Sequence, residues 1–280
     1  MSFEQPKFEK PPLAPSEKPE AQPEQKEARK EGLEGLKDYI KEMSLELKEE
    51  GVPVDDKARI DINKFDKVYS RQSIESDKAW IKDLKGRWER SAAAESRWSW
   101  AYPKEKALKD VPVGDVFEML TTSILHKKLN KDFIIARTSE YDDARNKVDN
   151  IILERETGNI VCAFDEIGAV SGERFNEKRN KVLERNWQRG GADLKYGLSL
   201  EKKTGKTELK KGAVYQIPLF YLSLPEEEIK KALHSPALEE NIFRSFVSSV
   251  SEQTKVIKEG PVHPKLRKRL DFFEKVIEKF

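Results

Sequence analysis

The spacing of apolar residues predicts that the folded part of the chain begins with helices. Residues 33–47 place apolar side chains at intervals of three and four, which is typical of an amphipathic helix, and Gly51 ends it. Residues 74–100 are predicted to be helical as well, with interleaved arginines. Large side chains along one face of a helix pack into a core more often than they stack on nucleobases, and both interpretations stay open. Its large side chains share one stripe: Trp80, Leu84 and Trp88.

The middle of the chain alternates between helical and strand patterns. A helix with an apolar face is expected over residues 113–129, and a charged helix over 173–188. Short apolar runs bounded by polar residues predict strands. These runs cover residues 132–137, 148–155, 160–164, 192–202 and 213–224, with a polar loop at 138–147 and a hairpin turn at 203–206. Helices resume at Pro225. The order predicts an α+β fold: an α-β-β-β-α-β core with helical flanks.

Composition divides the chain further. Residues 1–30 carry almost nothing to bury and are expected to form a disordered tail. A helical N-terminal region (31–110), an α/β core (111–224) and C-terminal helices packing on that core (225–280) follow. The net charge of +2 argues against wholesale polyanion binding. Cys162 is the single cysteine, and no stretch approaches a membrane span, so we expect a soluble cytoplasmic protein without a membrane partner.

The hairpin between the strands at 148–155 and 160–164 determines which acidic residues meet. If Gly158 takes the left-handed position of a three-residue loop, Asp149 faces Asp165 directly. Like charges opposite one another destabilise a sheet, so such a pair needs an ion or a proton between them. A four-residue loop would instead place Val148 opposite Asp165.

These acids and one preceding helix resemble a known family. Gly114-x-x-x-Glu118, then Asp149 at the start of one strand, then Asp165 at the end of the next, resembles the PD-(D/E)XK nuclease core. The resemblance covers residues 113–222. It implies a restriction-endonuclease-like fold that cleaves phosphodiester bonds of DNA or RNA. It also implies that Glu118, Asp149 and Asp165 bind Mg²⁺ or Mn²⁺, with the backbone carbonyl of Glu166 as a further metal ligand.

The sequence departs from that family at its lysine. Ile167 stands two residues after Asp165, where the family carries a lysine that orients the attacking water. Some members carry it on the following helix instead. Lys178 borders the apolar face of the 173–188 helix and is our candidate for a catalytic lysine, whereas Lys181 is expected to point outward.

Three functions remain open. The first is a metal-dependent nuclease with Glu118, Asp149, Asp165 and Lys178 as catalytic residues. The second is a catalytically decayed nuclease-like fold that binds nucleic acid or protein, which Ile167 favours. The third is an interaction scaffold in which the acids are incidental. The polar loop adds candidates that could supplement a metal site or contact phosphate, or simply face solvent: Glu140, Asp142, Asp143, Arg145 and Lys147.

Overall fold

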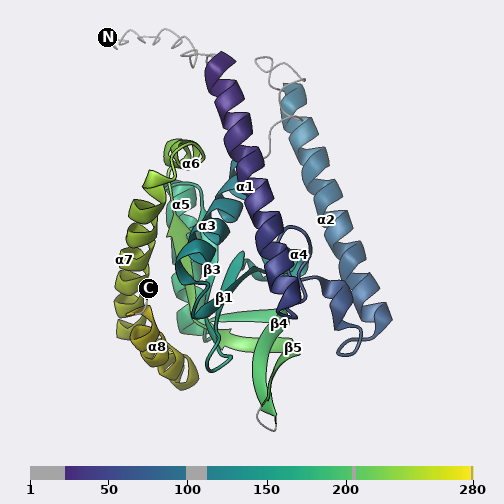
Figure 1. Ribbon diagram of the computed structural model, residues 1–280, viewed down its shortest axis with the longest axis vertical. Coiled ribbons are helices and arrows are strands. Elements are labelled where there is room, and N and C mark those ends of the chain that lie inside the picture. The colour runs from purple at the N-terminus through teal and green to yellow at the C-terminus, as the bar shows by residue number, and fades with distance from the viewer. Residues whose placement is uncertain (1–22, 99–111, 204–205, 279) are drawn as a thin grey trace, which may run out of the picture.

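The computed structural model has an α+β fold (Figure 1). It describes residues 23–98, 112–203, 206–278 and 280, and only the backbone of residues 23–30, 92–98, 200–203 and 206–208. The N-terminal part contains α1 (Pro23–Glu49), the 3-10 helix η1 (Ile62–Phe65) and α2 (Arg71–Trp98). The central part contains α3 (Val113–Leu129), β1 (Phe133–Arg137), α4 (Glu140–Asn146), β2 (Asn150–Glu154), β3 (Ile160–Ile167) and α5 (Glu173–Gln188). It continues with β4 (Ala192–Lys203), β5 (Lys206–Ile217) and β6 (Leu219–Ser223), and the C-terminal helices are α6 (Glu226–Ala232), α7 (Ala237–Glu259) and α8 (Pro264–Ile277).

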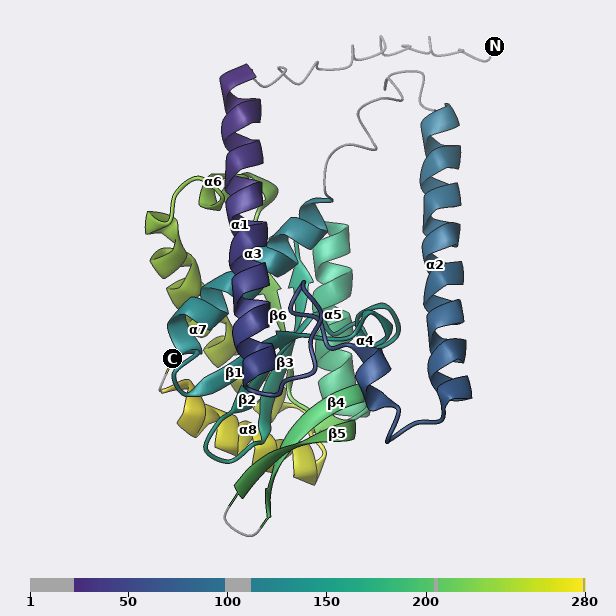
Figure 2. The ribbon, with the colours of Figure 1, turned by 45° about the vertical axis from the view of Figure 1, so that its right-hand side comes forward.

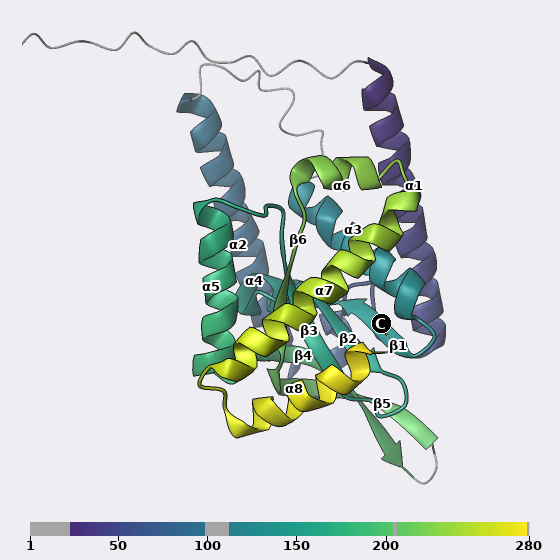
Figure 3. The same cartoon turned by 90° about the vertical axis from the view of Figure 1, so that its left-hand side faces the viewer.

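A four-stranded sheet with the order β1-β2-β3-β6 forms the centre of the fold. β2 runs antiparallel to both β1 and β3. β6 is parallel to β3, because the chain crosses back through α5 and the β4–β5 hairpin between them. That hairpin is a separate two-stranded sheet that projects from the body (Figure 3).

α3 and α5 lie on opposite faces of this sheet (Figure 2). Successive side chains of a strand point to opposite faces. On β3, Glu166 binds Asn150, whose amide oxygen in turn accepts a hydrogen bond from Thr122 of α3. Its neighbour Asp165 instead contacts Lys178 of α5. The alternation therefore directs two adjacent acids toward two different helices.

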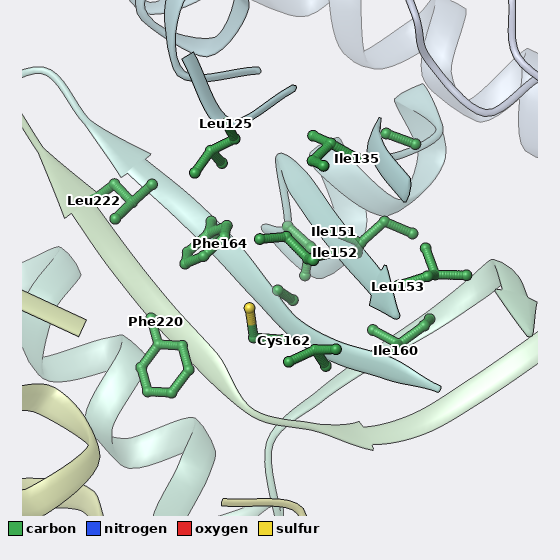
Figure 4. Close-up of a cluster of buried hydrophobic side chains, with 14 of the residues drawn as sticks. Leu125, Ile135, Ile151, Ile152, Leu153, Ile160, Cys162, Phe164, Phe220 and Leu222 are labelled. Carbon is green, nitrogen blue, oxygen red and sulfur yellow. The ribbon is translucent and has the colours of Figure 1, made fainter. Parts of the chain in front are cut away.

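The core fills the space between the sheet and its helices (Figure 4). Every residue of β1, β2 and β3 is buried. Phe164 and Cys162 are 2% and 0% exposed, and burial raises the pKa of the Cys162 thiol well above its usual value. Phe220 of β6, the register partner of Phe164, packs against Phe273 of α8 with ring centroids 4.8 Å apart. A polar side chain at the end of these strands is therefore buried among apolar side chains and needs a hydrogen-bond or charge partner.

α2 contacts the rest of the fold through β4 and α4. Lys195 of β4 donates to Asp77 of α2 at 2.5 Å, and its ammonium lies over the rings of Tyr69, Tyr141 and Tyr196. The predicted aromatic stripe of α2 is divided in its role: Trp80 packs on Tyr141, whereas Trp88 is 53% exposed, and residues 99–111 lie outside the described residues.

Two expectations from the sequence were wrong. The segment 138–147 is not a loop throughout, because Ser139 caps the short helix α4 by accepting a hydrogen bond from the amide of Asp142. The apolar run 213–224 is two strands in two sheets, separated at Pro218, which has no amide hydrogen to donate.

Residues 1–22 of the expected disordered tail (1–30) lie outside the described residues. Residues 23–30 belong to α1, which begins at Pro23. No helix in the described part of the chain has the length and apolar character needed to cross a membrane.

Candidate metal centre

Asp149 and Asp165 lie at the same end of the β2–β3 pair. Asn150 is the register partner of Phe164, and the amide of Asp149 donates to the carbonyl oxygen of Phe164 at 2.8 Å. This is the register that the sequence predicted, and it brings Asp149 and Asp165, the residues next to Asn150 and Phe164, to the same end of the strand pair.

The loop that precedes this register is not the one expected. The amide of Glu154 donates to the carbonyl oxygen of Asn159, so four residues connect the strands instead of three. Gly158 does take the left-handed conformation, with φ of 72°. A β-bulge then leaves Val161 as an extra residue in β3 and restores the pairing that the longer loop had shifted. The bulge therefore keeps the two aspartates at the same end of the strand pair.

Asp149 and Glu166 form a buried pair of carboxyl groups, 7% and 6% exposed. Oδ2 of Asp149 accepts a hydrogen bond from the amide of Glu166 at 2.7 Å, and Oε1 of Glu166 accepts one from Nδ2 of Asn150 at 2.7 Å. Oε2 of Glu166 has no hydrogen-bond partner within the described residues. The side chain of Glu166, and not only its backbone carbonyl, thus belongs to the site.

The protonation of this pair is strongly perturbed. Burial raises the pKa of Glu166 to about 7, and the negative charges of Glu118 and Asp165 add to the effect. Burial and the adjoining Glu166 carboxylate raise the pKa of Asp149 well above its usual value. Two carboxyl groups this close retain a proton at neutral pH unless a cation replaces it.

Lys178 reaches the same end of β3 from α5. Its Nζ lies 2.8 Å from Oδ1 of Asp165 and 3.1 Å from the carbonyl oxygen of Glu166. Burial works to lower the pKa of Lys178, but the charge of Asp165 and their hydrogen bond outweigh it and raise the pKa, so the ammonium stays charged. Lys181 instead pairs with Glu177 on the exposed side of the helix.

Glu118 of α3 is held by two arginines that the sequence analysis did not identify. Its Oε2 accepts hydrogen bonds from Nη2 of Arg59 at 2.7 Å and from Nη2 of Arg137. Arg137 is the last residue of β1, and its position at the end of a strand was the one feature of the sequence that indicated a place near the site. Arg59 comes from the segment before η1, where Ala58 has a φ of 57°, and no local pattern links it to Glu118.

α4 contributes Asp143 to the cluster. Nη1 of Arg59 donates to Oδ2 of Asp143 at 2.9 Å. One carboxylate oxygen from each of Glu118, Asp143 and Asp149 lies within 4.8 Å of the others, a spacing that one metal ion can bridge. Asp165 is not in that set and stands beside it with Lys178.

Asp142 holds α4 in this position. Its side chain is fully buried and accepts hydrogen bonds from Ser139, from Asn146 and from the amides of Lys195 and Tyr196. The Ser139-x-x-Asp142 spacing is a helix-start motif and was the available signal for α4. Asp142 is therefore structural, whereas Asp143 faces the acidic set.

The chemistry of these side chains fits a hard divalent cation. All candidate ligands are carboxylate oxygens, which suit Mg²⁺ or Mn²⁺. Along the chain of contacts, five carboxylates meet three cationic side chains, so the cluster lacks two positive charges, and Oε2 of Glu166 is an unpartnered buried acceptor. The carboxylates are Glu118, Asp143, Asp149, Asp165 and Glu166, and the cations are Arg59, Arg137 and Lys178.

No protein-family model matches this chain, and neither a curated protein nor a solved structure shows detectable similarity to it.

Proposed function

We propose that the chain is a Mg²⁺- or Mn²⁺-dependent phosphodiesterase that acts on DNA or RNA, and that α3, β1, β2, β3, α5 and β6 form a restriction-endonuclease-like core. Glu118, Asp149, Asp165 and Glu166 are the proposed metal ligands, and Lys178 is the proposed catalytic lysine. Asp143 joins the ligand set because of its distance from Glu118 and Asp149.

The observation that carries the proposal is the position of Lys178. Ile167 leaves the strand without a lysine, and Lys178 brings an ammonium from α5 to within 2.8 Å of Asp165 and 3.1 Å of the Glu166 carbonyl. The ammonium that pairs with Asp165 therefore also lies beside Glu166, whose Oε2 has no hydrogen-bond partner within the described residues.

Each side chain then has a defined task. A bound divalent cation would polarise the phosphate and lower the pKa of a coordinated water. The proposed ligands would supply the negative charge that holds it: Glu118, Asp143, Asp149, Asp165 and Glu166. Lys178, charged and anchored by Asp165, can donate a hydrogen bond to the attacking water and fix its orientation. The buried surroundings strengthen these electrostatic interactions relative to water.

A second function is favoured by the arginines. Glu118 already accepts hydrogen bonds from Arg59 and Arg137, which neutralise it without a metal. A nuclease-like fold whose acids have become internal ion-pair partners would bind nucleic acid or protein without cleaving it.

A cleavage assay distinguishes the two functions. Labelled single- and double-stranded DNA and RNA are incubated with the full chain in Mg²⁺, Mn²⁺ or EDTA. We expect metal-dependent cleavage that Asp165→Asn lowers by about 100-fold or more, while the exposed Glu156→Gln, at the far end of the β2–β3 hairpin, leaves it unchanged. Binding without cleavage in either metal would support the second function and contradict the first.

A further inference from the structure

A cavity of about 730 Å³ lies between α2 and residues 55–63, next to the acidic cluster. In Figure 2, α2 stands beside the body with this segment at its lower end. Three apolar side chains line the cavity: Ile60, Ile62 and Ile81, which are 3%, 9% and 6% exposed. A ligand of this cavity therefore offers at least one flat or apolar part as well as polar groups.

Lysines follow one side of the cavity along α2. Lys78, Lys82 and Lys85 are separated by four and three residues, so they lie on one helix face and extend over about 10 Å. Lys82 is exposed and has no ion-pair partner within the described residues. Lys78 and Lys85 pair with Glu75 and Glu140 at the surface, and such exposed pairs are weak. All three ammonium groups can be redirected to an anion at low cost.

Four acids line the cavity, and the protein already engages three of them, whereas Glu89 is exposed at the surface. Glu140 pairs with Lys85. Oδ1 of Asp55 accepts hydrogen bonds from the amides of Lys57 and Arg59, and Oδ1 of Asp61 accepts them from the amide and side chain of Asn63. These contacts hold the loop 55–63 and reduce the repulsion that the two acids exert on an incoming anion.

Arg59 connects the cavity with the acidic cluster. Arg59 is one of the residues that line the cavity, and its guanidinium binds Glu118 and Asp143. A strand in the cavity thus lies against the residue that contacts two members of the set around Asp149.

We propose that this cavity binds unpaired nucleotides of a nucleic-acid strand, with a base on the apolar floor and phosphates on Lys78, Lys82 and Lys85, and that Arg59 guides the strand toward the acidic cluster. The volume suits about one or two nucleotides and excludes a duplex. Only the last part, guidance toward the cluster, rests on the proposed phosphodiesterase function.

Binding is measured by fluorescence anisotropy in EDTA, with a short labelled single-stranded DNA and the full chain, so that no cleavage is needed. We expect Lys82→Glu/Lys85→Glu to weaken binding by about tenfold or more. The slope of the logarithm of the binding constant against the logarithm of the salt concentration should become less negative by about 1.4, because two phosphate contacts of a single strand are lost. The matched control is Lys265→Glu/Lys268→Glu, two exposed lysines at the same spacing on α8, which should bind like the wild type.

Two further ligands test whether a base binds the apolar floor of the cavity and whether the cavity excludes a duplex. An abasic strand with the same number of phosphates should bind several-fold more weakly, and a duplex should bind more weakly than the single strand. If the charge-reversed variant loses its far-ultraviolet circular dichroism spectrum, Lys82→Gln/Lys85→Gln replaces it, with an expected loss of a few-fold. Wild-type affinity and salt slope in the α2 variants, an equal loss in the α8 control, or preference for duplex would each overturn the proposal.

These outcomes are separate from those of the cleavage assay. Lysine-dependent strand binding without cleavage supports the cavity and contradicts the phosphodiesterase. Metal-dependent cleavage with strand binding unaffected by the α2 variants supports the phosphodiesterase and contradicts the cavity.

Discussion

Replacing Glu166 by Gln removes one of two buried carboxyl groups, those of Asp149 and Glu166, whose negative charges repel each other. The Gln side chain keeps the oxygen that accepts a hydrogen bond from Asn150, and its amide can donate to the carboxylate of Asp149. In EDTA at pH 8, we therefore expect Glu166→Gln to have a larger free energy of unfolding than the wild type.

The magnitude follows from the pKa of Glu166, which burial raises from 4.5 to about 7. The folded state of the wild type binds more protons than the unfolded state between these values. Its free energy of unfolding therefore falls as pH rises from about 4.5 to about 7 and stays low above that. A pKa shift of about 2.5 corresponds to at most about 3.4 kcal/mol. The Gln variant lacks this loss, so the two proteins should have similar stability near pH 5 and differ most at pH 8.

Chemical denaturation in EDTA at pH 5, 6, 7 and 8 measures this difference. The control is Glu156→Gln, which removes the same charge from an exposed loop and should follow the wild type at every pH. A Glu166→Gln variant that is less stable than the wild type at pH 8 would mean that Glu166 is a structural acceptor. The account of an electrostatically strained pair would then be refuted.

Two other substitutions test the catalytic lysine and the core. Lys178→Gln should lower metal-dependent cleavage by about 100-fold, whereas Lys181→Gln on the outer side of α5 should not, as measured in the cleavage assay; equal rates in both variants would contradict the role of Lys178. Phe164→Ala should lower the free energy of unfolding by about 3–5 kcal/mol in urea denaturation, because this ring is 2% exposed, and a neutral result would contradict its place in the core.

The sequence predicted the elements that have a strong apolar period. The helix at 113–129 and the charged helix at 173–188 were confirmed at the expected residues. The register of Asn150 with Phe164, next to Asp149 and Asp165, was also predicted, although the loop length behind it was wrong and the bulge at Val161 compensated. A bulge has no simple sequence pattern, so this agreement depended on a feature that could not be foreseen.

Contacts between distant segments were beyond sequence reasoning. Arg59 lies 59 residues before Glu118 and 84 before Asp143, and only the folded chain brings them together. The short helix α4 offers few apolar positions, so its start motif at Ser139 was the single clue. Asp143 was accordingly left among acids that could equally have faced solvent.

Calorimetric titration of Mn²⁺ and Mg²⁺ tests most directly whether these acids form a metal centre. We predict that the wild-type chain binds a divalent cation near neutral pH with release of protons, because the cation displaces the proton that the Asp149–Glu166 pair retains. The heat should then depend on the ionisation enthalpy of the buffer, and Asp149→Asn should abolish binding while Glu156→Gln does not. A wild-type chain that takes up no divalent cation, or an Asp149→Asn variant that binds it with unchanged affinity, would contradict the account.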